Sequence, residues 1–354
     1  MYEQLGLNLE PRQAAIVLGL LIGLLFGGLA EVSRFCFRRM VAGPLGERRS
    51  ATGVWFSGLI LAVIGTQVAM TQGLISFEEH RFFAADLPWL AIILGGLAFG
   101  AGMVLTRGCV SRLTVLAGTG NLRALIVLLA FAFIAHATLK GVLAPLRTTL
   151  GAVTVPLENT SLPGHPMIWS AVIILAALVM VLRSGARPRD MLLGALIGAL
   201  VPAAWVGTGY VLFDEFDPIA LESLSFTSPA AETLFWGVAS SSIPAGFGVG
   251  LLGGVLAGAL ALSLIFGRFQ WQSFETPRQT GRYLAGAALM GVGGVLAGGC
   301  TMGAGLSGIP TLSIAAILAV ASIAIGGKLT AQILRDGLPS SGANQTTPAP
   351  VPAA

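Results

Sequence analysis

Long apolar runs separated by short polar segments make up most of this chain. A run must reach about 20 residues to cross the hydrocarbon core of a bilayer as a helix. Runs close to this length lie near residues 14–33, 53–71, 89–106, 124–146, 168–182, 191–213, 246–267, 283–299 and 311–327. In lipid, each backbone amide must be hydrogen-bonded within its own segment, so these runs are predicted to be helices. The pattern predicts an all-α polytopic membrane protein with about nine transmembrane helices.

The polar connections between these runs alternate in charge. Basic residues occupy one set of connections, at Arg34, Arg38, Arg39, Arg48, Arg49, Arg107, Arg112, Arg123, Arg183, Arg187, Arg189, Arg268, Arg278 and Arg282. Acidic residues mark the connections on the other side, at Glu78, Glu79, Asp86, Asp214, Glu215, Asp217, Glu222 and Glu232. Lys and Arg concentrate in the cytoplasmic loops of membrane proteins. We therefore expect a multi-pass membrane protein with its N-terminus outside and its C-terminus in the cytoplasm.

Composition supports this class. Only 10% of residues are charged and 55% are hydrophobic, and the mean hydropathy is +0.84. The net charge of +4 is accounted for by basic loops, so no nucleic-acid partner is expected. The first run is flanked by Glu3, Glu10 and Arg12 rather than by a basic segment, so we expect it to be retained in the mature protein. Residues 1–335 are predicted to form a single transmembrane transport domain, and the Pro- and Ser-rich tail 336–354 is predicted to be disordered.

Two segments of the chain repeat each other and end in cysteine. GGLAFGAGMVLTRGC, closing at Cys109, matches GAALMGVGGVLAGGC, closing at Cys300, after a shift of 191 positions. A second pair, GLLIGLLFG and GLLGGVLAG, matches after a shift of 231, and Cys36 and Gly267 each follow nine residues later. These matches predict an internally duplicated chain with pseudo-symmetric halves, roughly 14–150 and 168–335, an arrangement typical of transporters. If all nine runs cross the membrane, the Cys109 and Cys300 helices run in opposite directions, whereas the Gly19 and Gly250 helices run in the same direction. Because one inverted repeat would not give both relations, we expect at least one span to be re-entrant.

Glycine-rich sequence surrounds the repeated cysteines. The segments TRGCVSR and AGGCTMGAGLSGIP resemble helix breaks, which at membrane depth are tolerated only around a cavity or within protein. They predict re-entrant half-helices. We expect Gly108 and Gly299, directly before the cysteines, to allow a positive φ or the close approach of a substrate. Gly194 and Gly198, in a span without cysteine, are expected to serve helix packing alone.

The three cysteines carry the candidate chemistry. A lone cysteine in a membrane helix is most often a small buried hydrophobic residue. The repeat favours function, because the thiol recurs at the same place in two segments. There is no C-x-x-C motif and no His or Cys at metal-ligand spacing, so no metal site or cofactor is expected. A neutral thiol is a weak, soft hydrogen-bonding group, suited to a polarisable sulfur atom.

With these segments in place, the chain resembles the YeeE/YedE family of membrane transporters of sulfur-containing anions, whose characterised members take up thiosulfate. The resemblance covers nearly the whole length and rests on SRFCF, GAGMVLTRGCVSRL with GTGNLRAL, and GVGGVLAGGCTMGAGLSGIP. It implies a monomeric hourglass in which loops from both faces converge on a narrow centre. The family's three cysteines map onto Cys36, Cys109 and Cys300, which are implied to pass thiosulfate along by S–H···S hydrogen bonds. The chain departs from the plain Gly-Gly-Cys pattern at Arg107 and Arg112, which flank Cys109.

Several ionisable residues in or near the spans are candidates for anion binding, ion pairing or proton coupling. Arg107 and Arg112 are candidates for tighter anion binding or a different substrate. Arg34 lies three residues after Glu31 on one helix face, and we expect these two to pair. His136 and Lys140 share a face of the fourth span. A structural hydrogen bond for His136 is favoured over proton coupling, with Lys140 either extending to the interface or pairing with Glu31.

Three functions fit the sequence. The favoured one is uptake of thiosulfate, with Cys36, Cys109, Cys300, Gly108, Gly299, Arg107, Arg112 and Arg34 at the substrate path. The second is transport of another sulfur or selenium species that feeds a soluble carrier, such as a TusA-like or rhodanese-like sulfurtransferase. The third is a membrane thiol–disulfide enzyme, which would need a resolving cysteine and a quinone site. The absence of a paired motif argues against it, so we expect a transporter in contact with membrane lipid and not an enzyme.

Overall fold

The computed structural model describes residues 10–78, 80–215 and 217–336, and the predicted disordered tail lies outside them apart from Asp336. The described elements, in chain order, are α1 (Pro11–Ser33), α2 (Phe37–Ala42), α3 (Leu45–Thr71), η2 (Arg81–Phe83), β1 (Asp86–Leu87), α4 (Trp89–Leu105), α5 (Val110–Gly118), α6 (Leu122–Lys140), α7 (Ala144–Gly151), β2 (Val155–Pro156), α8 (Pro166–Ser184), α9 (Pro188–Val206), η3 (Gly207–Val211), α10 (Thr227–Ala239), α11 (Phe247–Ile265), α12 (Pro277–Leu296), η4 (Thr301–Gly308), η5 (Ile309–Thr311) and α13 (Ile314–Asp336). The strands form one antiparallel pair, Asp86 with Pro156 and Leu87 with Val155.

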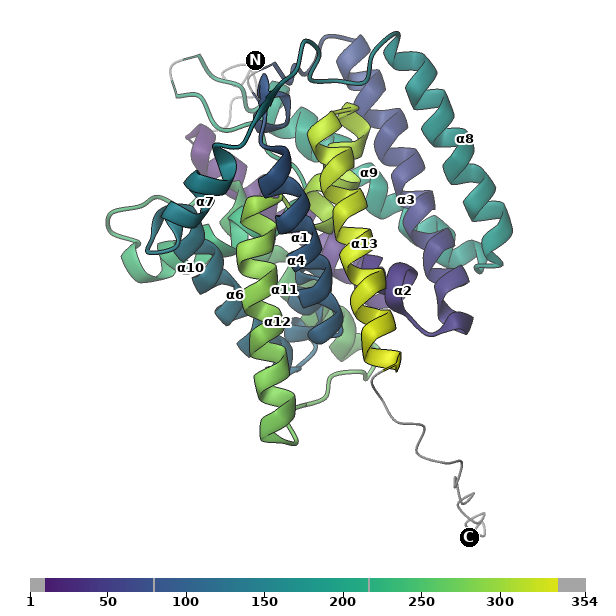
Figure 1. Ribbon diagram of the computed structural model, residues 1–354, viewed down its shortest axis with the longest axis vertical. Coiled ribbons are helices and arrows are strands. Elements are labelled where there is room, and N and C mark those ends of the chain that lie inside the picture. Colours follow the sequence, from purple (N-terminus) through teal and green to yellow (C-terminus); the bar gives the residue numbers. More distant parts are fainter. Residues whose placement is uncertain (1–9, 79, 216, 337–354) are drawn as a thin grey trace, which may run out of the picture.

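The prediction of an all-α polytopic membrane protein is confirmed. Within the described residues, nine helical segments are long and apolar enough to cross a bilayer, and they coincide with the nine apolar runs. Figure 1 shows most of the long helices running in roughly the same direction, with α8 at one edge of the bundle. The largest difference lies at the fourth span, where α6 ends at Lys140 and Gly141 caps it. The predicted run continued to residue 146 because it stayed apolar, although Pro145 begins a separate helix, α7.

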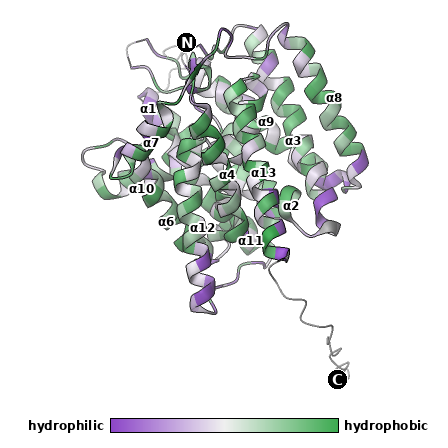
Figure 2. Cartoon of the chain, in the orientation of Figure 1, coloured by the Kyte–Doolittle hydropathy of each residue, from purple (hydrophilic) through white to green (hydrophobic). Residues whose placement is uncertain are grey.

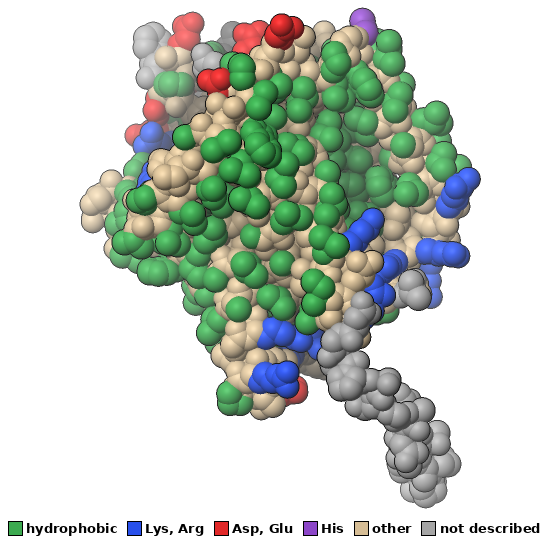
Figure 3. Space-filling view, in the orientation of Figure 1, with side chains coloured by type: hydrophobic (Ala, Val, Ile, Leu, Met, Phe, Trp, Pro, Cys, Tyr) green, Lys and Arg blue, Asp and Glu red, His purple; other side chains and the backbone are tan. Residues whose placement is uncertain are grey.

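Charge and hydropathy divide the surface into three zones. Figure 2 shows hydrophobic residues along the middle of the helices, and Figure 3 shows a broad apolar surface with Asp and Glu gathered at one end. Lys and Arg gather at the opposite end, around the start of α12 and the end of α13. We call these the acidic end and the basic end. Large apolar side chains of the long helices, such as Phe133, Leu182 and Ile168, are strongly exposed, as expected of a surface that meets lipid.

Close glycine contacts fix the directions of the helices. Gly19 and Gly23 of α1 meet successive turns of α11, so these two helices run parallel. Gly95 and Gly102 of α4 meet α12 in reverse order, so that pair is antiparallel. Both pairs are the repeat-related segments identified in the sequence. The directions of these four helices agree with alternating spans, so neither repeat-related pair requires a re-entrant span.

Short helices supplement the spans. α5 has 9 residues and α10 has 13, which at about 1.5 Å per residue is too short to cross the core. α10 begins at buried Thr227 and ends near Val238, which is 80% exposed. It is a half-helix that runs from the interior to the surface, in a segment where the sequence predicted none.

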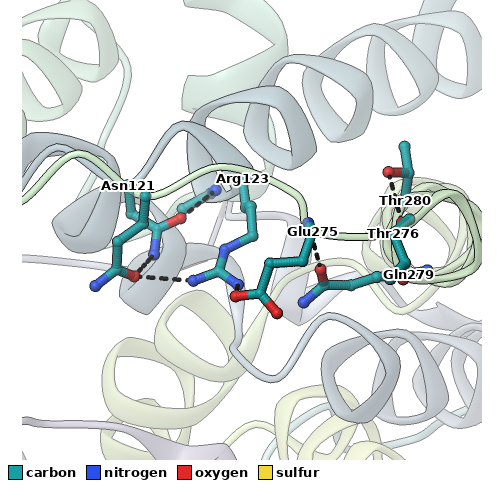
Figure 4. Close-up of polar contacts among 8 residues, drawn as sticks. Asn121, Arg123, Glu275, Thr276, Gln279 and Thr280 are labelled. Atoms are coloured by element: carbon teal, nitrogen blue, oxygen red, sulfur yellow. Dashed lines mark hydrogen bonds and ion pairs between the residues drawn. The ribbon is translucent and has the colours of Figure 1, made fainter.

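A cluster of polar contacts lies at the basic end, around the start of α6 and α12 (Figure 4). Asn121 caps α6 by accepting from the Ala124 amide at 3.0 Å, and it donates to the Gln272 side chain at 2.8 Å. Arg123 donates to the same Gln272 oxygen at 2.9 Å. Asn121 therefore has a structural role at the surface.

Candidate functional site

Each cysteine follows the same kind of helix break. Arg34, Arg107 and Gly298 adopt a left-handed conformation, with φ of 53°, 58° and 70°, two residues before Cys36, Cys109 and Cys300. Each cysteine is then the N-cap of the next short helix, α2, α5 or η4. The left-handed residue ends one helix and redirects the chain into the next. The thiols therefore lie at helix N-termini, where unpaired amides and the helix dipole favour a negative charge.

The predicted role of the two glycines before the cysteines needs correction. Neither Gly108 nor Gly299 has a positive φ; the left-handed position is one residue earlier, at Arg107 and Gly298. A Cβ on Gly108 would make only ordinary contacts, the nearest with Leu113 at 3.4 Å. A Cβ on Gly299 would lie 3.0 Å from the Ala304 amide nitrogen, which is tight. Close approach of backbone, rather than dihedral freedom, accounts for Gly299.

The three thiols lie in one chain of contacts. The side chains of Cys36 and Cys109 are hydrogen-bonding neighbours. Cys109 also contacts Ser111, with its sulfur 3.2 Å from the Ser111 oxygen, and it interacts with Thr301, the residue after Cys300. Cys300 accepts a hydrogen bond from the Gly303 amide at 3.5 Å. All three cysteines are free and at most 4% exposed.

Beyond Cys300, a cavity of about 790 Å³ opens toward the acidic end. Gly303 and Ser307 of η4 line it, so the cavity reaches the helix that Cys300 caps. Its walls come from the connection after α3, from η2 and from the segment between η3 and α10. The cavity and the Cys300 segment are thus adjacent.

Three titratable side chains in the cavity have shifted pKa values. Burial raises the pKa of the Glu222 carboxyl to about 7, with a further contribution from Glu232, while Arg81 opposes this rise. Burial lowers the pKa of the Arg81 guanidinium below its ordinary value, against the opposing effect of nearby Cys300, Glu222 and Glu232. Burial and Arg81 lower the pKa of His80 to about 4, so this imidazole is neutral at pH 7.

Two of the three arginines proposed for the substrate path lie at the surface. Arg34 and Arg107 are exposed. Arg112 points inward, with its side chain 14% exposed, and its NH1 atom lies 3.6 Å from Glu31, whose side chain is 9% exposed. The expected pairing of Glu31 with Arg34 is therefore wrong, because Arg34 ends α1 and turns away while α5 brings Arg112 to Glu31. Arg112 is held by a counter-charge close to the Cys36–Cys109 pair.

The other polar candidates have structural contacts. The His136 ring stacks on Phe235 of α10, with centroids 4.3 Å apart. Lys140 is exposed and forms no ion pair with Glu31. Gln67 donates to the Pro310 carbonyl at 2.7 Å, which ties α3 to η5.

Sequence reasoning missed several residues around the thiols. Arg81, Glu222 and Ser225 come from two connections far apart in the chain, and only the fold joins them in one cavity. The run Ser223-Leu-Ser-Phe-Thr227 offered a signal, because hydroxyl residues alternate there directly before a half-helix. Thr301 could have been found from its position directly after Cys300.

Comparison with known proteins identifies the family of this chain. The Sulphur transport family matches residues 32–192 and again residues 183–329, so the two matches together span most of the chain. The chain belongs to the Sulphur transport family. Two curated relatives are each named thiosulfate transporter TsuA. The Escherichia coli K12 protein is 26% identical over 319 residues, covering 82% of this chain and 86% of its own length. The Spirochaeta thermophila protein is 26% identical over 338 residues, covering 89% and 98%.

Membership of the Sulphur transport family confirms the resemblance seen in the motifs. It identifies the chain as a transporter of sulfur anions and not as an enzyme. Both segments that carry the repeated cysteines, around Cys109 and Cys300, lie within the family matches.

Proposed function

We propose that this protein takes up thiosulfate across the bacterial inner membrane and passes the anion along Cys300, Cys109 and Cys36 by non-covalent S–H···S hydrogen bonds. The acidic end faces outward with the N-terminus, and the basic end and the C-terminus face the cytoplasm, in accordance with the positive-inside rule. Support for the substrate comes from the relatives, both of which are named thiosulfate transporters.

The main support for the proposed substrate path is the order of the three cysteines between the outer cavity and the basic end. Neighbouring groups lead from the bottom of the outer cavity toward the basic end. Gly303 donates to Cys300, the next residue, Thr301, lies near Cys109, and Cys109 lies near Cys36. Cys36 caps α2, the helix that contains Arg38 and Arg39 and leads to the basic end. A substrate that leaves the cavity therefore meets three thiols in turn.

Thiols suit this task on physical grounds. Conduction requires several weak sites in series, because one strong site would trap the anion. Each thiol offers a soft contact to the terminal sulfur of thiosulfate, and each helix N-terminus offsets part of the anion's charge. Arg112 is already paired with Glu31, so its charge is partly compensated and does not form a deep trap.

The alternative is another sulfur or selenium species handed to a soluble carrier. Arg34 and Arg107, exposed close to the cysteines in sequence, would suit an acidic surface on a TusA-like or rhodanese-like sulfurtransferase at the basic end. In this arrangement, the exit of the passage and the docking site of the carrier would coincide.

Uptake by the purified protein in liposomes separates the two substrates. Radiolabelled thiosulfate should accumulate, and unlabelled thiosulfate should compete more effectively than sulfate, sulfite or selenite. Stronger competition by sulfite or selenite would favour the alternative. The absence of any thiosulfate accumulation would exclude the proposed function.

A further inference from the structure

The outer cavity contains a cation without a contacting counter-ion. The guanidinium of Arg81 donates to the Ser228 hydroxyl at 3.3 Å and lies 5.4 Å from the centre of the Phe82 ring. Among the residues that the structure describes, no carboxylate forms an ion pair with it. Protein surrounds Arg81 on most sides, which lowers its pKa, but the side chain remains accessible from the cavity that it lines. An arginine that is accessible and unpaired in a cavity can bind an oxyanion.

A hydroxyl without a partner lies in the same cavity. The Ser225 oxygen is buried and forms no hydrogen bond, although Ser225 lines the cavity wall. It lies 2.8 Å from where a Cβ on Gly303 would be, so it adjoins the helix that Cys300 caps. A buried, unsatisfied hydroxyl is costly, and a ligand oxygen would remove that cost.

Glu222 opposes an anion at this place. It lines the cavity and interacts electrostatically with Arg81. The other charged or titratable groups that line the cavity are Glu78, His80 and Glu232. Asp217 of the same connection pairs with Arg12 at 3.8 Å, Asp214 has a partner of its own, and Glu79 lies outside the described residues.

We propose that Arg81, Ser225 and Ser228 form an oxyanion-binding site in the outer cavity, and that ionised Glu222 competes with the anion for Arg81, so that anion binding is linked to proton binding at Glu222. The proposal rests on the proposed function for its ligand, thiosulfate. The guanidinium and the hydroxyls take the sulfonate oxygens, which are hard acceptors. The soft terminal sulfur is left free for Cys300, which caps the helix that lines the cavity.

The sign of the pH dependence follows from this arrangement. Glu222 is largely neutral below its pKa of about 7, and Arg81 is then available to the anion. Above that pH the carboxylate repels the anion and attracts Arg81, so affinity falls as pH rises. Because a bound dianion would push the Glu222 pKa higher still, linkage predicts an affinity loss of roughly five- to tenfold between about pH 6 and about pH 8. His80, neutral throughout this range, does not contribute to the change.

Calorimetric titration of the full-length protein in lipid nanodiscs with thiosulfate tests the site. The unaltered protein should lose affinity as pH rises. Glu222→Gln should bind at about pH 8 as tightly as the unaltered protein binds at about pH 6, with little remaining pH dependence. Arg81→Gln should lose at least about tenfold at both pH values, and Arg81→Lys should retain more affinity, because it keeps the charge. Glu78→Gln is the matched control, since it removes a carboxylate that lines the same cavity, and it should keep the pH profile of the unaltered protein.

Three results would overturn the proposal: normal affinity in Arg81→Gln, an unchanged pH profile in Glu222→Gln, or the same loss of pH dependence in Glu78→Gln. Sulfate, titrated in parallel, keeps this test separate from the substrate assignment. If thiosulfate is neither bound nor imported, the proposed function fails. The oxyanion site is then tested with sulfate alone: it is supported if Arg81→Gln lowers sulfate affinity and Glu222→Gln removes its pH dependence, and it is excluded if neither occurs.

Discussion

At the scale of residues, the thiols differ from buried apolar side chains in what they contact. Cys109 has Cys36, Ser111 and Thr301 around its sulfur, which is a polar environment for a residue that is 1% exposed. A cysteine that only filled space would not need these hydroxyls. The contact with Ser111 is a weak sulfur–hydroxyl hydrogen bond, of a kind that a soft anion can replace.

Replacement of single cysteines should therefore affect transport and not folding. Cys36→Ala, Cys109→Ala and Cys300→Ala each remove a hydrogen bond to a charged ligand, worth about 1.5–3 kcal/mol, so uptake should fall roughly 10- to 100-fold. Serine should not restore it, because a hydroxyl is smaller and harder than a thiol. The measurement is initial uptake rate alongside thermal stability. Uptake at normal rates in Cys109→Ser and Cys300→Ser would contradict the role of soft contacts.

At the scale of elements, glycine has two distinct uses. Gly198 of α9 lies against the backbone of Gly58 in α3, so a side chain there would force two spans apart. Gly299 instead lies between Gly298, which adopts a left-handed conformation, and the Cys300 cap. Gly198 holds two spans together, and Gly299 shapes the backbone that leads into Cys300.

Alanine at these two positions should separate packing from transport. Gly198→Ala overpacks an interface and should cost about 1–3 kcal/mol, seen as a lower melting temperature. Gly299→Ala should lower uptake more than stability, because the Ala304 backbone beside Cys300 must shift. Gly108→Ala, with room for a Cβ in the equivalent repeat position, is the matched control and should fold normally. Normal uptake in Gly299→Ala with a transport defect in Gly198→Ala would contradict the placement of the passage.

The spans were predictable from sequence, whereas the breaks were predictable only in part. Apolar runs of sufficient length leave helices as the only solution in lipid, which is why all nine were found. The left-handed positions at Arg34 and Arg107 were missed because glycine normally fills such positions. The contact between Glu31 and Arg112 joins α1 to α5, and spacing within one helix could not reveal it. The cavity was missed for the same reason, since Arg81 and Glu222 meet only in the folded chain.

At the scale of the whole molecule, charge distinguishes the two ends. The acidic end contains the cavity, and α2 with Cys36 at its cap leads toward the basic end. In the proposed orientation, the membrane potential of a bacterial cell, negative inside, opposes anion entry. A proton that crossed with the anion would reduce this cost, because less net charge would move.

The orientation can be tested with reporters. An enzyme active only in the cytoplasm, fused after Asp336, should be active, whereas the same enzyme fused before Pro11 should not. The pair also serves as its own control for expression, since an exported reporter should show the opposite result. Cytoplasmic activity from the N-terminal fusion would reverse the proposed path.

The central claim is that thiosulfate crosses intact along Cys300, Cys109 and Cys36. The most direct test is uptake into liposomes of thiosulfate labelled with radioactive sulfur, in one sample at the terminal sulfur and in another at the sulfonate sulfur. Non-covalent transfer predicts that both labels accumulate at equal rates and that both are lost together in Cys109→Ala. Entry of the terminal-sulfur label without the sulfonate label would show that a thiol captures sulfur covalently, and it would contradict the account.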